Sequence, residues 1–157
     1  MHEFSTQQFL PISIEEAWSF FSSPKNLSLI TPPEMDFKIV TPHLEDKIHE
    51  GMRIEYRVKP LWGITMKWET RIGQVLSPHY FTDIQTKGPY AFWQHTHHFV
   101  EKNNGVQMLD ELIYQLPMGF IGNIVHRLIV KKKIEKIFEY RRNVLTKLFP
   151  EHDKRVA

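Results

Sequence analysis

The chain has 157 residues, of which 41% are hydrophobic, and it carries 20 basic and 18 acidic side chains. This length and composition are typical of one globular domain, residues 1–157, with enough apolar residues for a sizeable core. A net charge of +2 is too small to indicate a nucleic-acid-binding protein.

The chain contains no cysteine, which excludes disulfides, thiolate nucleophiles and cysteine-ligated metals. Its first residues lack the basic and apolar regions of a signal peptide. No apolar run approaches the roughly 18 residues that cross a bilayer. We therefore expect a cytoplasmic protein.

The beginning of the chain predicts one strand and two short helices. Residues 3–10 suit the strand. Ser13 and Glu16 then form a capping box, in which the hydroxyl and the carboxylate satisfy free helix N–H groups. The helix that follows has apolar residues at three- and four-residue spacing and stops at Pro24. Residues 25–30 suit the second short helix.

The middle of the chain predicts further strands over residues 37–41, 52–58, 66–72 and 80–87. Apolar and charged residues alternate in the second and third of these, as in an antiparallel sheet with one solvated face. We predict the register that sets Glu55 against Lys67. It also opposes Arg53 and Glu69, whereas a slip of two residues would oppose like charges. This register leaves a tight loop at residues 60–62.

Residues 93–114 predict a β-hairpin. Asn104-Gly105 favours a turn because both residues tolerate a positive φ. A two-residue loop there sets Asp110 opposite Phe99 and diagonal to His97. Because strand side chains alternate, one face collects Trp93, His95, His97, Met108, Asp110, Leu112 and Tyr114.

The rest of the chain predicts one long helix over residues 123–149, which contain no proline or glycine. Lys131-Lys132-Lys133 weakens its apolar stripe, so a bend could occur there. The order of elements predicts an α+β fold, in which a curved antiparallel sheet of six to seven strands wraps the C-terminal helix and leaves a cavity.

Several segments resemble the START-like superfamily, also called Bet v 1-like, SRPBCC or helix-grip. They are residues 11–21, 24–33, 88–90, Trp93, 95–97, 110–111, 114–117, Gly119, Gly122 and 138–141, and they span nearly the whole chain. The resemblance implies a helix-grip fold. Its members include lipid and metabolite carriers, polyketide cyclases, co-chaperone domains and regulators. Some similar members occur beside nucleotide-sugar epimerase-like domains, which implies such a protein as a partner.

The inner face of the hairpin and its neighbouring strands form the predicted ligand site. We expect the binding residues to be Tyr56, Trp68, Thr70, Trp93, His95, His97, Met108, Asp110, Leu112 and Tyr114. Aromatic rings with polar tips are common in ligand pockets, although ordinary core packing is the alternative. An inward carboxylate at Asp110 is costly unless paired, and its expected partner is His97 or a backbone N–H near the second helix.

Three functions are compatible with these patterns. The first is binding or transport of a hydrophobic small molecule, such as a lipid, isoprenoid or aromatic metabolite. The second is a polyketide cyclase or dehydratase, with His97 as general base, Asp110 orienting it and Tyr114 donating to a carbonyl oxygen. The third is a non-catalytic interaction module. We expect a binding protein rather than an enzyme.

The sequence predicts no metal and no cofactor. His95 and His97 form half of a metal site that His126 or Asp110 could complete, but nothing local supplies a clear third ligand. No nucleophile elbow and no phosphate-binding glycine loop occurs. The basic run at residues 131–133, with Arg127 and the apolar residues 118–125, could touch an anionic membrane transiently during lipid exchange, although a solvated helix face is favoured.

Overall fold

The computed structural model describes residues 1–60, 63–117 and 129–151. Its strands are β1 (His2–Leu10), β2 (Lys38–Ile39), β3 (Arg53–Val58), β4 (Met66–Leu76), β5 (Tyr80–Lys87), β6 (Phe92–Lys102) and β7 (Gly105–Gln115). Its α-helices are α1 (Ile14–Phe21) and α3 (Lys131–Leu148), and two 3₁₀ turns, η1 (Pro24–Ser28) and η2 (Pro33–Met35), follow α1.

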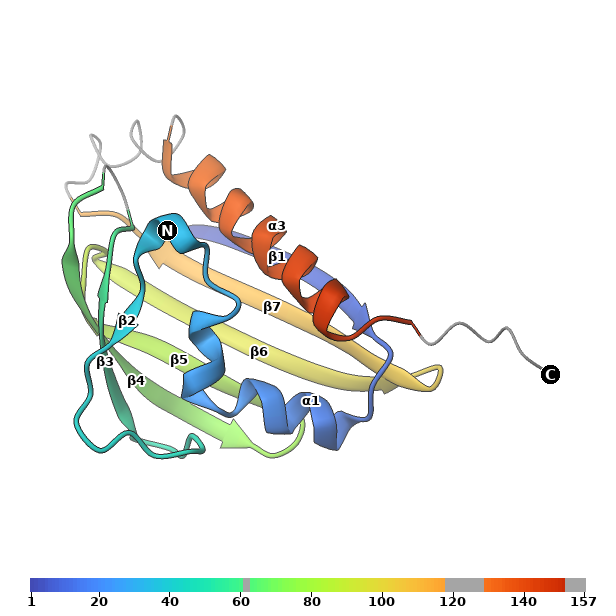
Figure 1. Cartoon of the computed structure of the whole chain (residues 1–157). Coiled ribbons are helices and arrows are strands. Elements are labelled where there is room, and N and C mark those ends of the chain that lie inside the picture. The colour runs from blue at the N-terminus through green and yellow to red at the C-terminus, as the bar shows by residue number, and fades with distance from the viewer. Residues whose placement is uncertain (61–62, 118–128, 152–157) are drawn as a thin grey trace.

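Within the described part of the chain, one antiparallel sheet contains seven strands in the order β1-β7-β6-β5-β4-β3-β2. The sheet is curved, and α3 lies across its concave side (Figure 1). The predicted α+β helix-grip architecture, with short helices after the first strand and a long C-terminal helix, is confirmed. None of the helices in the described ranges is long and apolar enough to span a membrane.

Helix α1 begins at the predicted cap. The backbone N–H of Glu16 donates to Ser13 Oγ at 3.1 Å, which satisfies one of the free donors of the first turn. The buried face of α1 packs on the sheet, where the Phe21 ring lies 5.2 Å from that of Phe99. The predicted second helix is the 3₁₀ turn η1, so this segment is shorter and tighter than a helix over residues 25–30.

Helix α3 is joined to the edge strand β1 by hydrogen bonds as well as by apolar packing. Gln8 Nε2 donates to Arg142 O and to Thr146 Oγ1, both at 3.1 Å. The buried residues of α3 follow helical spacing: Ile134, Phe138, Arg141 and Leu145. One face of α3 is therefore committed to the sheet.

Some predictions concern residues outside the described part of the chain. These are residues 61–62 of the predicted loop, residues 123–128 of the predicted helix, the candidate ligand His126, and the candidate membrane-contact residues 118–125 with Arg127.

The predicted register of the β6–β7 hairpin is wrong by two residues. Asn103 and Asn104 hold the positive φ values of the turn, 48° and 62°, and Lys102 pairs with Gly105. Gly105 has a different role: a Cβ there would lie 2.4 Å from the Phe9 ring and 2.5 Å from a backbone carbonyl of β1. The glycine therefore permits close approach of β1. Since a shift of two residues preserves the face of each side chain, the inner face of the hairpin is as predicted.

The new hairpin register changes which residues meet. His97 pairs directly with Asp110, and Phe99 pairs with Met108. The imidazole and the carboxylate are thus cross-strand neighbours rather than a diagonal pair, which shortens the distance between them.

The predicted register of β3 and β4 is also wrong. Glu55 lies opposite Glu69, but the buried Glu69 carboxylate has other partners. Arg53 Nη1 lies diagonally at 2.8 Å from Oε1, and on β5 Thr86 Oγ1 donates at 2.6 Å and Lys87 Nζ at 3.0 Å. Diagonal contacts and contacts with the third strand, β5, therefore outweigh the repulsion between the directly opposed like charges.

The Glu69 network predicts a pH-dependent contribution to stability. The Thr86 hydrogen bond, followed by Lys87, lowers the pKa of Glu69 from 4.5 to about 2. Glu69→Gln should reduce the free energy of unfolding by about 1 kcal/mol at pH 7. A depressed carboxylate pKa stabilises the fold above the unfolded-state value, so this difference should shrink as the pH falls from 4.5 toward 2.

Urea unfolding across that pH range measures the effect. Glu55→Gln is the matched control, because that side chain is exposed on the facing strand. A difference between wild type and Glu69→Gln that stays constant with pH would contradict the role given to the ionised carboxylate.

Candidate functional site

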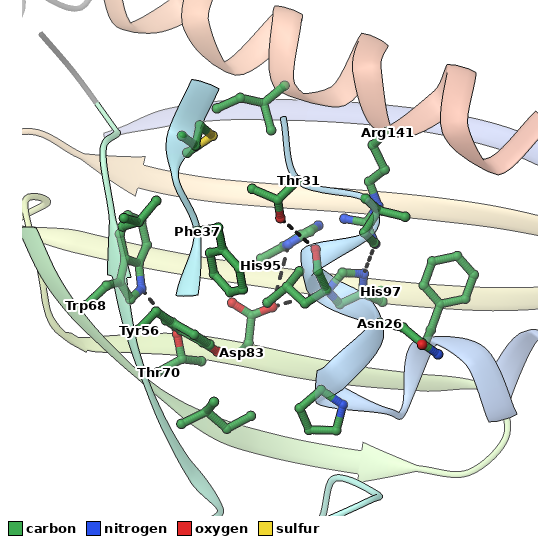
Figure 2. A pocket seen from close by; sticks show the side chains of 18 of the residues that line it. Asn26, Thr31, Phe37, Tyr56, Trp68, Thr70, Asp83, His95, His97 and Arg141 are labelled. Carbon is green, nitrogen blue, oxygen red and sulfur yellow. Dashed lines mark hydrogen bonds and ion pairs between the residues drawn. The ribbon is translucent and has the colours of Figure 1, made fainter. Parts of the chain in front are cut away.

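A cavity of about 200 Å³ lies between the concave face of the sheet, α3 and the segment from α1 to η2. Its wall is mostly apolar, and its rings include Phe37, Tyr56, Trp68, Tyr90, Trp93 and Phe138. Trp68 Nε1 donates to Thr70 Oγ1 at 3.2 Å, so the indole keeps a polar partner inside the wall. Figure 2 shows Tyr56 and Trp68 on one side, His97 and Arg141 on the other, and Asp83 and His95 between them.

The predicted binding residues fall into two groups. Those on β3, β4 and β6 line the cavity: Tyr56, Trp68, Thr70, Trp93, His95 and His97. Those on β7 do not, and they are buried in the core: Met108, Asp110, Leu112 and Tyr114. The reason is the position of the helices, since Leu112 and Tyr114 pack beneath α3 while Met108 packs in the cluster that includes α1.

Sequence reasoning missed two charged residues of the site, Asp83 and Arg141. Asp83 stands two positions after the buried Phe81 on β5, so alternation places it on the inner face. Arg141 stands three positions after Phe138 on the buried stripe of α3. The spacing of the apolar residues predicts an inward side chain at both positions. A charged residue there interrupts the apolar pattern, however, so neither was assigned to the site.

Asp110 is the buried centre of an ionic cluster. Its side chain is 1% exposed, and Oδ1 lies 2.8 Å from His97 Nδ1 and 2.9 Å from His95 Nε2. Arg141 Nη1 approaches the same oxygen at 3.7 Å. The predicted pairing of Asp110 with His97 is therefore present, and it is extended by a second imidazole and a guanidinium.

Asp83 contacts the opposite edges of the same two imidazoles. Its Oδ2 lies 3.1 Å from His97 Nε2 and 3.6 Å from His95 Nδ1. Each ring therefore has one nitrogen facing Asp110 and the other facing Asp83. The His97 ring also stacks on Phe81, with ring centroids 4.4 Å apart, so its orientation is fixed by packing as well as by charge.

The cluster balances its charges internally. Burial opposes ionisation of Asp110 and Asp83, but Arg141 and hydrogen bonds from the histidines hold the pKa of Asp110 well below its usual value. A hydrogen bond from His97 lowers the pKa of Asp83. Burial also opposes charge on His97, but its two carboxylate partners raise its pKa. Burial and the charge of His97 lower the pKa of His95. The guanidinium of Arg141 and the two imidazoles thus supply the partners of the two carboxylates.

Two buried polar atoms of the cluster lack hydrogen-bond partners among the described residues: Asp110 Oδ2 and Arg141 Nε. The guanidinium of Arg141 lies 5.5 Å from the Phe21 ring and 5.8 Å from the Phe138 ring, where cation–π attraction replaces part of its hydration. Figure 2 shows Arg141 extending from α3 toward His97. The charge on Arg141 is therefore held inside the protein rather than at its surface.

Comparison with known proteins gives a fold and no activity. No protein-family model matches the chain, and no curated protein matches its sequence. Among solved structures, a START superfamily protein from Mycobacterium smegmatis has a TM-score of 0.70 at 12% identity, over 94% of this chain and 99% of that one. A protein from Chromobacterium violaceum has a TM-score of 0.69 at 12% identity, over 97% and 100% of the two chains.

This chain has the START-like helix-grip fold. The resemblance inferred from the sequence segments is thereby confirmed at the level of the fold. A nucleoside-diphosphate sugar epimerase from Corynebacterium glutamicum is also similar, with a TM-score of 0.66 at 21% identity over 92% of this chain. The match spans only 28% of that enzyme, so it concerns one part of a larger protein.

The buried cluster predicts that loss of Arg141 is costly. Arg141→Met leaves Asp110 with one compensating cation fewer, and we expect a loss of about 3 kcal/mol in unfolding free energy. Adding Asp110→Asn should recover part of that loss, because the uncompensated charge is removed. Chemical denaturation of the two single variants and the double variant measures the coupling.

Lys136→Met is the matched control, since it removes a positive charge from the exposed face of the same helix. It should change stability by less than about 0.5 kcal/mol. Additive losses for Arg141 and Asp110 would show that their charges do not compensate each other.

Proposed function

We propose that the chain binds a small hydrophobic molecule that carries one polar group. The observation behind this proposal is the cavity, which joins a wall of aromatic and aliphatic side chains to a charged end formed by Asp83, His95 and His97. Pockets of this kind gain affinity from apolar burial and orientation from a few polar groups. Among the four cluster members that line the cavity, which include Arg141, Asp83 has the most exposed side chain, at 21%.

The dimensions of the cavity favour a compact ligand. Its volume of about 200 Å³ lies below the roughly 300–1,000 Å³ of pockets that hold drug-sized molecules. A one- or two-ring aromatic metabolite or a short isoprenoid fits such a volume better than a long-chain lipid does. Thr70 and Asp83 supply acceptors for a hydroxyl group at the polar end of such a molecule.

The cyclase or dehydratase alternative has less support from the geometry. His97 lies between two carboxylates that raise its pKa, which favours a protonated ring over a general base. Tyr114 is 1% exposed and is not among the cavity-lining residues. The third alternative, a non-catalytic interaction module, does not need a cavity of this kind. Association with a nucleotide-sugar epimerase-like protein stays a prediction.

The direct experiment is native mass spectrometry of protein purified from its host, combined with thermal-shift screening of aromatic and short isoprenoid compounds. We expect a bound small molecule, or a rise in melting temperature with one compound class, because a ligand that binds only the folded state stabilises it. Protein that is always empty and unshifted by the whole library would contradict the proposal.

A cavity-filling variant tests where the ligand binds. Ile137 on α3 lines the cavity, so Ile137→Trp should weaken binding of the identified compound at least tenfold by occupying its space. Lys136→Trp places the same ring on the exposed face of the helix and should leave binding unchanged. Equal affinities of the two variants for the compound would show that it binds outside this cavity.

A further inference from the structure

Three potential metal-ligand atoms converge at the charged end of the cavity. They are His95 Nδ1, His97 Nε2 and Asp83 Oδ2, and all lie within 4.8 Å of one another. The carboxylate oxygen is 3.6 Å from the first nitrogen and 3.1 Å from the second. In a regular zinc tetrahedron with bonds of about 2.0–2.2 Å, ligand atoms are about 3.3–3.5 Å apart. These two separations differ from the tetrahedral value by only a few tenths of an ångström, and the two histidine nitrogens lie within 4.8 Å of each other.

The other nitrogen of each ring is already held by a carboxylate. Asp110 Oδ1 lies 2.9 Å from His95 Nε2 and 2.8 Å from His97 Nδ1. Metal-binding histidines commonly donate their second ring N–H to such a carboxylate, which selects the tautomer and fixes the ring orientation. One buried aspartate lies in position to do this for both rings, and the other nitrogen of each ring faces Asp83.

The three residues lie on rigid, paired strands. His95 and His97 are two positions apart on β6, and Asp83 is the direct cross-strand partner of His95 on β5. The centroids of the two imidazole rings are only 3.9 Å apart. The sheet therefore presents the three side chains together without help from a loop.

We propose that Asp83, His95 and His97 bind one divalent transition metal ion, with Zn²⁺ the best match to two imidazoles and one carboxylate. The three residues line the cavity, so a fourth coordination position faces its interior. With both histidines neutral, the charges of the divalent ion, Asp83, Asp110 and Arg141 add up to +1. An anionic oxygen, from hydroxide or from a ligand carboxylate or phenolate, completes the tetrahedron and the charge balance.

This site shares Asp83, His95 and His97 with the charged end of the proposed ligand cavity, but metal binding by these residues does not require the apolar ligand. The third ligand that was missing near the His95–His97 pair in the sequence is supplied by Asp83, from the neighbouring strand.

The test uses tag-free full-length protein that has been stripped with a chelator. We expect calorimetric titration with Zn²⁺ to give one ion per chain, and Co²⁺ to develop the intense visible absorption of a tetrahedral site. Absence of stoichiometric binding of either ion by the wild-type chain would overturn the proposal, whatever the behaviour of the variants.

Variants identify the ligands. Asp83→Asn and His97→Gln should each weaken Zn²⁺ binding at least tenfold and abolish the cobalt spectrum. Asp110→Asn should weaken binding by about 10- to 100-fold while leaving a tetrahedral spectrum, as expected of a positioning residue.

His98→Gln is the matched control, because His98 lies on the same strand but contacts Glu111 on the outer face of the sheet. It should bind like the wild type. If His98→Gln removes the ion, or if both ligand variants retain wild-type affinity and spectrum, the metal lies at a surface histidine and the proposal is wrong. Circular dichroism of each variant confirms that the fold is retained.

Discussion

The charge on Asp110 is the constraint on which the site depends. A carboxylate that is 1% exposed must be matched by nearby cations and donors, and they come from β6 and α3. His95, His97 and Arg141 converge on it for that reason, and Asp83 on β5 then faces the free edges of the imidazoles. The ionic cluster thus joins the middle strands of the sheet to the helix that crosses them, in addition to the apolar packing between them.

The same arrangement explains why the cavity has one charged end. Helix α3 covers β7 and β1, so inner side chains of those strands pack in the core. The cavity lies instead over β3 to β6, where inner side chains such as Tyr56, Trp68 and Trp93 line it. The ionic cluster lies at the boundary between the two regions. A molecule in the cavity would therefore meet aromatic rings over most of its surface and Asp83 with the two histidines at one end.

Both errors of register share a cause. In the β6–β7 hairpin, Asn-Gly is the better turn pair in isolation, but Gly105 is required where Phe9 and the β1 backbone approach it, and Asn103-Asn104 forms the turn instead. In β3 and β4, opposite charges across the two strands favour the predicted register. Thr86 and Lys87 on β5 instead stabilise the observed register, because both bond to Glu69. In each case a third strand, absent from the local argument, decided the outcome. Because both shifts are by two residues, the inner and outer faces were still assigned correctly.

Periodicity in the sequence alone determined the order of elements, the capped first helix, the inner face of each strand and the inward direction of His95, His97 and Asp110. These features depend on alternation, helical spacing and local capping, which act over a few residues. Only the tertiary structure decided that Asp83 and Arg141 complete the cluster, and that packing with α1 and α3 places Met108, Leu112 and Tyr114 in the core rather than in the cavity wall. Those outcomes depend on which distant segments lie side by side. The desolvation cost of the buried charges is offset only when all of their partners are in place.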